Sequence, residues 1–557
     1  MFLCYDVRGI QSFIFRIPKL KYIIGGSAVI DRFDRETIKN LTLPQGCECL
    51  FTGGGKGTFV CPSKESAEEL RKLILAEATK IGVDIRFGID ENYDQASKHA
   101  TDLYPFIPQD LSGGFPCNVS GLYPVDSPKG EHPIVKARLF SRSAPRDSEE
   151  YRMFRYFEHR LLEKEKLAVE LDSSNPEKLE FFHNVAGTDD RGNYDKDGDI
   201  GAKVLGDRNR WAVICMDGND MGSQMTEKIK SLEGDAEKGV KMSRWVKAMS
   251  AAIDRCSTEA AKAGIKAVYE KWVKSDDQQN LEGDDKFVLP MRPLVVGGDD
   301  VTVLCHVNYA IDFVKAVCDK FEQVSQEENA KALQDIGESI WPATGGRITI
   351  SAGILYCPVS LPLHSAIAYA EALLASAKTR GREVKAKLVK QGGEANQLQP
   401  TPASIDWEHI TNSVLETPAI YRKRHLYFYD PDIKKKVCLT KRPYTLQEFE
   451  TVLKLKNRYG TKREGQDSRD AIPTTIRHKV SEALTKSQNS RMAFVASIAK
   501  NYKDLAQDLC ENGFEIFGKS ESKWELSADG GELSTSVVDA LQLLEEDKRM
   551  EEGTNND

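Results

Sequence analysis

The sequence lacks the segments that would direct a chain into or across a membrane. No apolar run approaches the roughly 20 residues that a membrane-spanning helix needs. The first stretch, Met-Phe-Leu-Cys-Tyr-Asp, has no basic segment and soon meets an acid, so it does not read as a signal peptide. We therefore expect a cytoplasmic protein without a membrane partner.

Several catalytic signatures are also missing. The 12 cysteines are scattered without a Cys-x-x-Cys repeat, which argues against zinc and fits buried thiols in a reducing compartment. The absence of a Gly-x-x-x-x-Gly-Lys-Ser/Thr loop disfavours a P-loop ATPase, and the absence of a Gly-x-Ser-x-Gly elbow disfavours a serine hydrolase.

What remains is an ordinary globular composition. The chain has 557 residues, of which 40% are hydrophobic and 29% charged, and its length favours roughly three or four domains. Its net charge of −8 does not attract polyanions as a whole, so any contact with nucleic acid must come from a local basic patch.

Two aliphatic runs flank the stretch Gly297-Gly298-Asp299-Asp300. This pattern predicts a β-hairpin with glycines and acids at its tip, where a ligand can approach the backbone closely. Adjacent carboxylates are costly to hold together without a cation, which favours a magnesium site that handles phosphates. The alternative is a solvated Gly-Asp turn.

The chain repeats one plan twice. A short apolar strand ends near Asp6 and another near Asp217, and each is followed by a helix and then a glycine hairpin. Gly53-Gly54-Gly55 corresponds to Gly297-Gly298-Asp299. The sequence therefore predicts a duplicated domain whose second copy alone keeps the hairpin acids.

Three acids of the second copy should meet on neighbouring strands. Asp217, Asp299 and Asp300 can hold two Mg²⁺ ions, with the Gly218 carbonyl as a further ligand. Such a palm-like site predicts nucleotidyl transfer or cyclisation from a nucleoside triphosphate.

Basic residues recur at two further places. On the helix predicted for 363–390, Lys378, Arg382 and Lys385 would counter a triphosphate, or form a solvated face. The stretch 434–479 holds thirteen Lys or Arg against five acids, with Tyr444 and Tyr459 interleaved. It reads either as a phosphate-binding face or as a solvated helix surface.

Taken in order, these motifs resemble the large subunit of type III CRISPR effector complexes, the Cmr/Csm polymerase-cyclase family. The resemblance covers nearly the whole chain. Its first palm is matched at 9–15 (Gly-Ile-Gln-Ser-Phe-Ile-Phe), 25–27 and 53–55, its second palm at 216–222, 297–300, 349–353 and 370–378, and the start of its last domain at 402–407 and 441–445.

The resemblance implies an α+β fold with two ferredoxin-like palm domains of the GGDEF/nucleotide-cyclase kind. The implied domains are a first palm (1–104), a small intervening domain (105–204), a second palm (205–395), a helical carboxyl-terminal domain (396–544) and an acidic disordered tail (545–557).

The resemblance also implies an activity: synthesis of cyclic oligoadenylates from ATP with Mg²⁺ or Mn²⁺, in antiviral defence. Asp217, Asp299 and Asp300 would be the catalytic acids, and Ser351 and Lys378 would lie near the nucleotide. The implied partners are CRISPR backbone subunits with guide RNA and target RNA, while stand-alone or homo-oligomeric action stays open.

Three departures from the family pattern bear on these expectations. The chain begins in the first palm and contains no His-Asp dipeptide, so we expect no amino-terminal nuclease domain. The zinc-knuckle cysteines are not present as a set. The order Asp217-Gly218-Asn219-Asp220 displaces the second acid by one residue from Asp-x-Asp, so Asp220 is expected to point away from the metal.

Two other functions fit the same residues. The chain is a scaffold of a guide-RNA complex if its cyclase is weak or silent, and it is a GGDEF-like cyclase if it uses GTP, although Asp300 stands where that family has Glu. The sequence leaves ring size, base preference, the activating signal and nucleotide binding by the first palm undetermined.

Overall fold

The computed structural model divides into two compact units. The first contains Met1–Ser351, Cys357–Ala368 and Val384–Thr401, and the second contains Ala352–Tyr356, Tyr369–Glu383 and Pro402–Asp557. The residues described are 1–15, 20–101, 115–116, 124–125, 155–174, 176–182, 210–235, 237–274, 287–392, 398–410, 416–430, 434–460, 472–509, 524–526 and 532–547.

The first unit begins with a four-stranded antiparallel sheet in the order β2-β3-β1-β4. Helix α3 begins after a capping box in which Ser63 is the N-cap residue. It ends at Gly82, whose φ of 72° is a conformation that favours glycine. The elements are β1 (Phe2–Arg8), α1 (Ile10–Phe15), α2 (Leu20–Arg32), η1 (Phe33–Ile38), β2 (Glu48–Gly53), β3 (Lys56–Val60), α3 (Lys64–Ile81), β4 (Asp84–Asp90) and α4 (Tyr93–Thr101).

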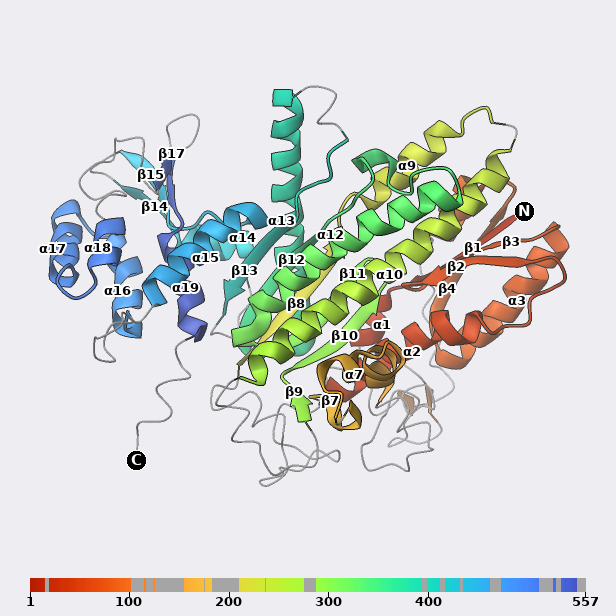
Figure 1. The fold of residues 1–557 in the computed structure, drawn as a ribbon, viewed down its shortest axis with the longest axis horizontal. Coiled ribbons are helices and arrows are strands. Elements are labelled where there is room, and N and C mark those ends of the chain that lie inside the picture. Colours follow the sequence, from red (N-terminus) through yellow and green to blue (C-terminus); the bar gives the residue numbers. More distant parts are fainter. Residues whose placement is uncertain are drawn as a thin grey trace. The chain divides into compact units, whose positions relative to one another are not determined.

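A second βαββαβ series follows the same plan. In the first unit its strands lie in the order β10-β11-β8, which repeats β2-β3-β1. The long helices α10 and α12 run side by side (Figure 1). The elements are β8 (Arg210–Gly218), α9 (Met221–Ser231), α10 (Lys238–Trp272), β10 (Met291–Gly297), β11 (Asp300–His306), α12 (Ala310–Asp335), β12 (Ile350–Pro358) and α13 (Leu363–Gly392).

The register of the two sheets confirms the duplication. Asp6 lies opposite Lys56 on β1 and β3, and Asp217 lies opposite Asp300 on β8 and β11. Each hairpin closes with two residues between its strands, at 54–55 and 298–299. The α+β class with two palm-like halves is therefore confirmed.

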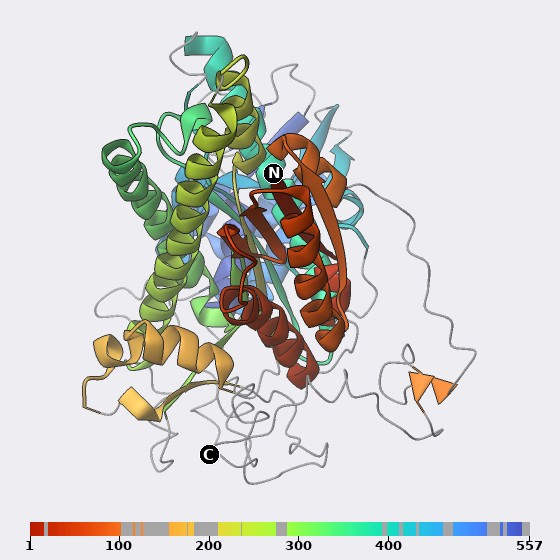
Figure 2. The ribbon, with the colours of Figure 1, turned by 90° about the vertical axis from the view of Figure 1, so that its right-hand side faces the viewer.

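The described part of the intervening region 105–204 belongs to the first unit. It contains β5 (Phe115–Pro116), β6 (Pro124–Val125), η2 (Glu158–Lys164), α7 (Leu167–Leu171), η3 (Pro176–Lys178) and β7 (Leu179–Phe181). β7 pairs in parallel with β9 (Phe287–Leu289), just before β10. In Figure 2 the gold segment of η2 and α7 lies beside one end of α10.

The second unit is less helical than the sequence predicts. Besides its helices it contains a four-stranded sheet in the order β14-β15-β18-β17. These strands have three or four residues each, and β14 and β15 carry exposed tyrosine and lysine, so the long alternating pattern by which strands are recognised is missing.

The elements that follow α13 are β13 (Ser404–His409), α14 (Pro418–His425), β14 (Tyr427–Asp430), β15 (Lys435–Cys438), β16 (Tyr444–Thr445), α15 (Leu446–Gly460), α16 (Thr474–Leu484), α17 (Gln488–Ile498), α18 (Lys503–Leu509), β17 (Trp524–Leu526), β18 (Glu532–Thr535) and α19 (Val537–Asp547). Most of the predicted tail, 548–557, lies outside the described residues. No described helix is both long and apolar enough to cross a membrane.

Candidate active site

The hairpin between β10 and β11 forms the tip of the candidate site. Gly297 pairs with Asp300, so Gly298 and Asp299 make the turn. Gly298 has a φ of +59°, a conformation that residues with a side chain rarely adopt. The two predicted acids therefore occupy the end of the turn and the first residue of β11.

The structure brings the three predicted acids together. Asp300 lies directly opposite Asp217, and one carboxylate oxygen from each of Asp217, Asp299 and Asp300 lies within 4.8 Å of the others. Like charges placed opposite each other on a sheet destabilise it, and a bound divalent cation would offset this cost. Carboxylate oxygens are also the ligands that Mg²⁺ prefers.

Gly218 leaves room for this arrangement. Its amide donates a hydrogen bond to the Asp299 carbonyl (3.2 Å), which ties the turn to the end of β8. A Cβ atom at this position would lie 2.9 Å from the Asp299 Cβ, closer than real Cβ atoms come to other atoms. The sequence therefore needs glycine here. Metal binding by the Gly218 carbonyl stays a prediction.

Asp220 is held away from the three acids, as the displaced spacing predicts. It adopts a φ of +62° and accepts hydrogen bonds from the Thr401 amide (2.7 Å) and hydroxyl (2.8 Å). The Lys385 ammonium lies 3.3 Å from the same carboxylate. Asp220 thus anchors the chain around Thr401.

A buried polar network supports the end of β8. The Asn219 amide group donates to the hydroxyls of Thr349 (2.8 Å) and Ser351 (2.9 Å), and all three side chains are buried. Ser351 is completely enclosed, so its hydroxyl orients Asn219 in this structure. Its predicted proximity to a nucleotide stays a prediction, as does that of Lys378 and Arg382, which belong to the second unit.

The outer edge of β10 is capped by side chains whose contact with this strand the sequence did not predict. The carbonyls of Leu294, Val296 and Gly298 face away from β11. They accept hydrogen bonds from the Ser27 hydroxyl, the Arg160 guanidinium and the Ser257 hydroxyl, respectively. These donors come from α2, η2 and α10. Together they fix the strand that leads into the acidic turn.

Asp31 links this edge to both palm-like halves. It accepts hydrogen bonds from the Tyr156 hydroxyl (2.7 Å), Arg160 (2.9 Å) and Arg35 (3.0 Å). Arg35 also forms a two-point ion pair with Asp254 on α10. Although burial opposes the charge on Arg35, the carboxylates of Asp31 and Asp254 raise its pKa.

The corresponding site of the first half has a different chemistry. Lys56 stands where the second half has Asp300, and Gly55 stands where it has Asp299. Asp34 holds this turn by accepting from the Gly55 amide (2.6 Å) and the Tyr5 hydroxyl (2.9 Å). Burial raises the pKa of Asp34 to about 7. The cluster Asp6, Lys56, Asp34 and Tyr5 therefore resembles a structural site more than a cation site.

The tyrosines of the basic stretch 434–479 are not on the surface. Tyr444 and Tyr459 are buried, and their hydroxyls donate to Asp539 and Asp508 (2.8 Å for the second). These two aromatics therefore do not belong to an exposed face, whereas phosphate binding by the basic residues of the stretch stays a prediction. The pattern misled because a tyrosine between lysines looks the same in sequence whether its ring points inward or outward.

Comparison with known proteins identifies part of the chain. Residues 210–386 match the family model of Cas10/Cmr2, second palm domain. The match runs from β8 into α13 and contains all three acids. No curated protein matches the chain.

Solved structures resemble the chain at low identity. A crystal structure of a Csm1-Csm4 cassette in complex with cA4 has 13% identity and a TM-score of 0.46, over 98% of this chain and 69% of that chain. The crystal structure of Csm1 in T. onnurineus gives a TM-score of 0.47 at the same identity and coverage.

The family match confirms the resemblance seen in the motifs of the second half. The motifs 216–222 and 297–300 lie within the matched residues, and they contain the three acids that converge in the structure. Residues 210–386, with their three convergent carboxylates, are therefore similar to the second palm domain of the Cas10/Cmr2 family.

Proposed function

We propose that this protein is a nucleotidyltransferase that makes cyclic oligoadenylates from ATP by two-metal catalysis, in CRISPR-type antiviral defence. One observation carries the proposal. Within a Cas10/Cmr2 second palm domain, Asp217, Asp299 and Asp300 converge to within 4.8 Å, as a divalent-metal site requires.

The residues present fit Mg²⁺ or Mn²⁺. Asp217, Asp299 and Asp300 supply hard oxygen ligands, and the Gly218 carbonyl lies beside them in sequence. When bound, two such ions supply activation of an attacking hydroxyl and neutralisation of a leaving pyrophosphate. The protein itself contributes a fixed turn, because Gly298 allows its conformation and Gly218 leaves space for Asp299.

The nucleotide would lie over the turn. Gly297 and Gly298 present backbone without side chains, so a triphosphate can approach closely. We assign Lys378, Arg382 and Lys385 to the phosphates and Ser351 to the neighbourhood of the nucleotide. In this structure the Lys385 ammonium contacts the Asp220 carboxylate. To bind a phosphate, Lys385 would have to leave Asp220 and contact a phosphate oxygen instead.

The partners follow from the same family assignment. We propose that the protein works with CRISPR backbone subunits, guide RNA and target RNA. The family match and the order of the sequence motifs support this. Action by the chain alone is the simpler variant, and the experiment below separates the two.

Product analysis by mass spectrometry tests the proposal. The full chain is incubated with ATP and Mn²⁺ or Mg²⁺, and we expect cyclic oligoadenylate from the wild type. The Asp299→Ala/Asp300→Ala variant should lose product, with a reduction above about 100-fold, and should keep its fold because Asp300 is exposed and Asp299 is only half-buried. The matched control Glu69→Ala/Glu91→Ala removes two exposed carboxylates of the first half and should retain full activity.

The other outcomes decide between the alternatives. If product forms only after addition of partner subunits and target RNA, the enzyme acts within a complex. If product is absent even then, the scaffold function replaces the enzyme. A parallel reaction with GTP that gives cyclic guanylates in place of adenylates would assign the GGDEF-like activity.

A further inference from the structure

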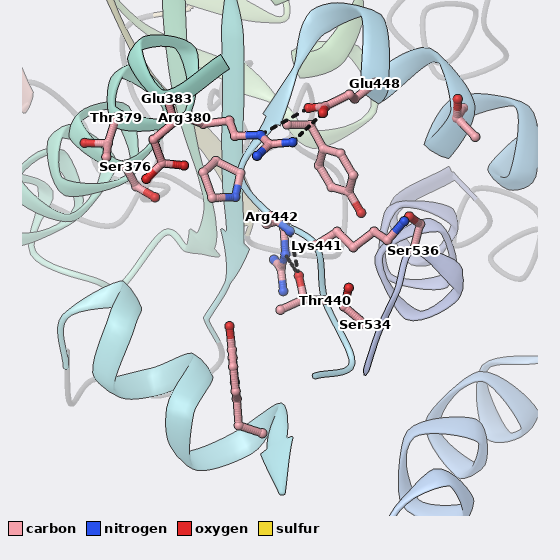
Figure 3. A pocket seen from close by; sticks show the side chains of 14 residues that line it. Ser376, Thr379, Arg380, Glu383, Thr440, Lys441, Arg442, Glu448, Ser534 and Ser536 are labelled. Carbon is pink, nitrogen blue, oxygen red and sulfur yellow. Dashed lines mark hydrogen bonds and ion pairs between the residues drawn. The ribbon is translucent and has the colours of Figure 1, made fainter. Parts of the chain in front are cut away.

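The second unit contains a cavity of about 660 Å³ that shares no residue with the three acids (Figure 3). Its walls come from the middle of α13, the start of β14, the connection from β15 into β16, the first turns of α15 and the end of β18 with Ser536 after it. The volume falls within the roughly 300–1,000 Å³ typical of small-ligand sites. The cavity is thus large enough for a nucleotide.

Hydrogen-bond donors dominate the walls. Lys441 and Arg380 provide cations, and hydroxyl groups come from Thr440, Ser534 and Ser536. Lysine ammonium, guanidinium and hydroxyl groups are the donors that proteins use for phosphate and ribose oxygens.

Ion pairs hold two of the wall residues in place. Arg380 forms a two-point contact with Glu448, shown by dashed lines in Figure 3. Burial opposes the charge on Glu448, but Arg380 and the Thr445 amide (2.8 Å) lower its pKa, so the carboxylate stays ionised and paired. Arg442 is likewise fixed, by Glu408 (3.1 Å) and Asp539 (3.0 Å). The cavity is therefore built before any ligand arrives.

An aromatic and basic strip continues from the cavity. Tyr427 lines it with 40% of its surface exposed, and Tyr429, two residues along the same face of β14, is 60% exposed. Lys436 on β15 lies directly opposite Tyr429 and is also exposed. Exposed rings beside cations are the pattern by which proteins hold single-stranded nucleic acid without reading its sequence.

We propose that this cavity and strip form a single-stranded nucleic-acid site that is separate from the acids. One nucleotide occupies the cavity, with its base on Tyr427 and its phosphate near Lys441. The next nucleotide lies over Tyr429 beside Lys436. A free nucleoside monophosphate shares the chemistry of the first position, and the test distinguishes the two sources.

Fluorescence anisotropy with a labelled RNA hexamer and the full chain measures this binding. Tyr427→Ala should weaken binding roughly tenfold through lost stacking, whereas Tyr427→Phe should stay within about twofold because it keeps the ring. Lys441→Ala should lower the slope of log affinity against log salt by about 0.7, the value for one phosphate contact in a single strand. Lys486→Ala, which removes a lysine outside the cavity, should change neither quantity.

Each result decides. Equal binding by wild type, Tyr427→Ala and Lys441→Ala would overturn the site. Loss of binding in the Asp299→Ala/Asp300→Ala variant would place the RNA at the acids and overturn the separate site. If AMP competes as well as unlabelled hexamer, and Tyr429→Ala has no effect, the ligand is a free nucleotide and the strand site is overturned. Thermal melting confirms that each variant is folded.

Discussion

At the scale of single residues, the acidic site depends on two glycines as much as on its acids. Gly298 allows the turn, and Gly218 leaves the space that the Asp299 side chain fills. The acids carry the negative charge, and the two glycines determine the positions of the carboxylates. A conservative change at Gly218 should therefore act on metal binding through geometry alone.

We predict that Gly218→Ala weakens Mn²⁺ binding roughly tenfold, a typical effect of disturbing the support of a metal ligand. The added methyl group would lie 2.9 Å from the Asp299 Cβ and would push the turn aside. Titration followed by electron paramagnetic resonance measures the affinity. Gly222→Ala is the matched control, since nothing lies within 4 Å of its new Cβ and binding should not change.

Residue-level prediction from the sequence worked where the information is local. Asp217 and the hairpin acids meet because strand alternation and a two-residue turn fix their register over a few positions. The contacts of Ser27, Arg160 and Ser257 with β10 could not be predicted, because each donor is a common residue far away in the sequence. The prediction that Tyr444 and Tyr459 are exposed failed, because the direction of each ring depends on tertiary packing.

At the scale of elements, β10 is an edge strand of its sheet in the first unit, yet its outer carbonyls are occupied. An unprotected edge would twist or pair with other chains, and the acidic turn at its end would move with it. Arg160 is the central donor, because it joins the Val296 carbonyl to Asp31. The small intervening region thus supports the strand that leads into the acidic turn.

We predict that Arg160→Ala lowers the free energy of unfolding by about 1–3 kcal/mol, because it leaves the buried Val296 carbonyl without its side-chain donor and Asp31 with one cation fewer. It should also weaken Mn²⁺ binding several-fold. Arg155→Ala is the control, since Arg155 contacts Glu163 and Glu180 on the same segment and contacts β10 in no described hydrogen bond. Chemical denaturation and metal titration measure the two effects. Loss of stability with unchanged metal affinity in Arg160→Ala would contradict a positioning role.

The same scale shows where sequence patterns end. The repeated order of strand, helix and glycine hairpin was predictable, because each step has a local sequence pattern. The sheet β14-β15-β18-β17 was missed, although β14 carries the exposed tyrosines of the proposed nucleic-acid strip. Short polar strands obtain their stability from partners distant in sequence, so no local pattern marks them.

At the scale of the whole molecule, the two halves of the first unit meet through charged pairs on α10. Arg35 contacts Asp254 at two points, with 19% and 42% of the side chains exposed. Lys247, on the same helix, contacts Glu48 of β2, with 56% and 59% of the side chains exposed. The two pairs bridge the same halves and differ mainly in burial and geometry, which makes them a natural comparison.

We predict a coupling free energy of about 1 kcal/mol between Arg35 and Asp254, and close to zero between Lys247 and Glu48. The first pair is partly shielded and held by Asp31, whereas the second is fully open to screening by salt. Double-mutant cycles with alanine, measured by urea denaturation at low and high salt, give both values. If the two couplings are equal, the partial burial of the Arg35–Asp254 pair adds nothing to its strength, and the contacts of Arg35 with Asp31 and Asp254 do not couple the two halves more strongly than an open surface pair does.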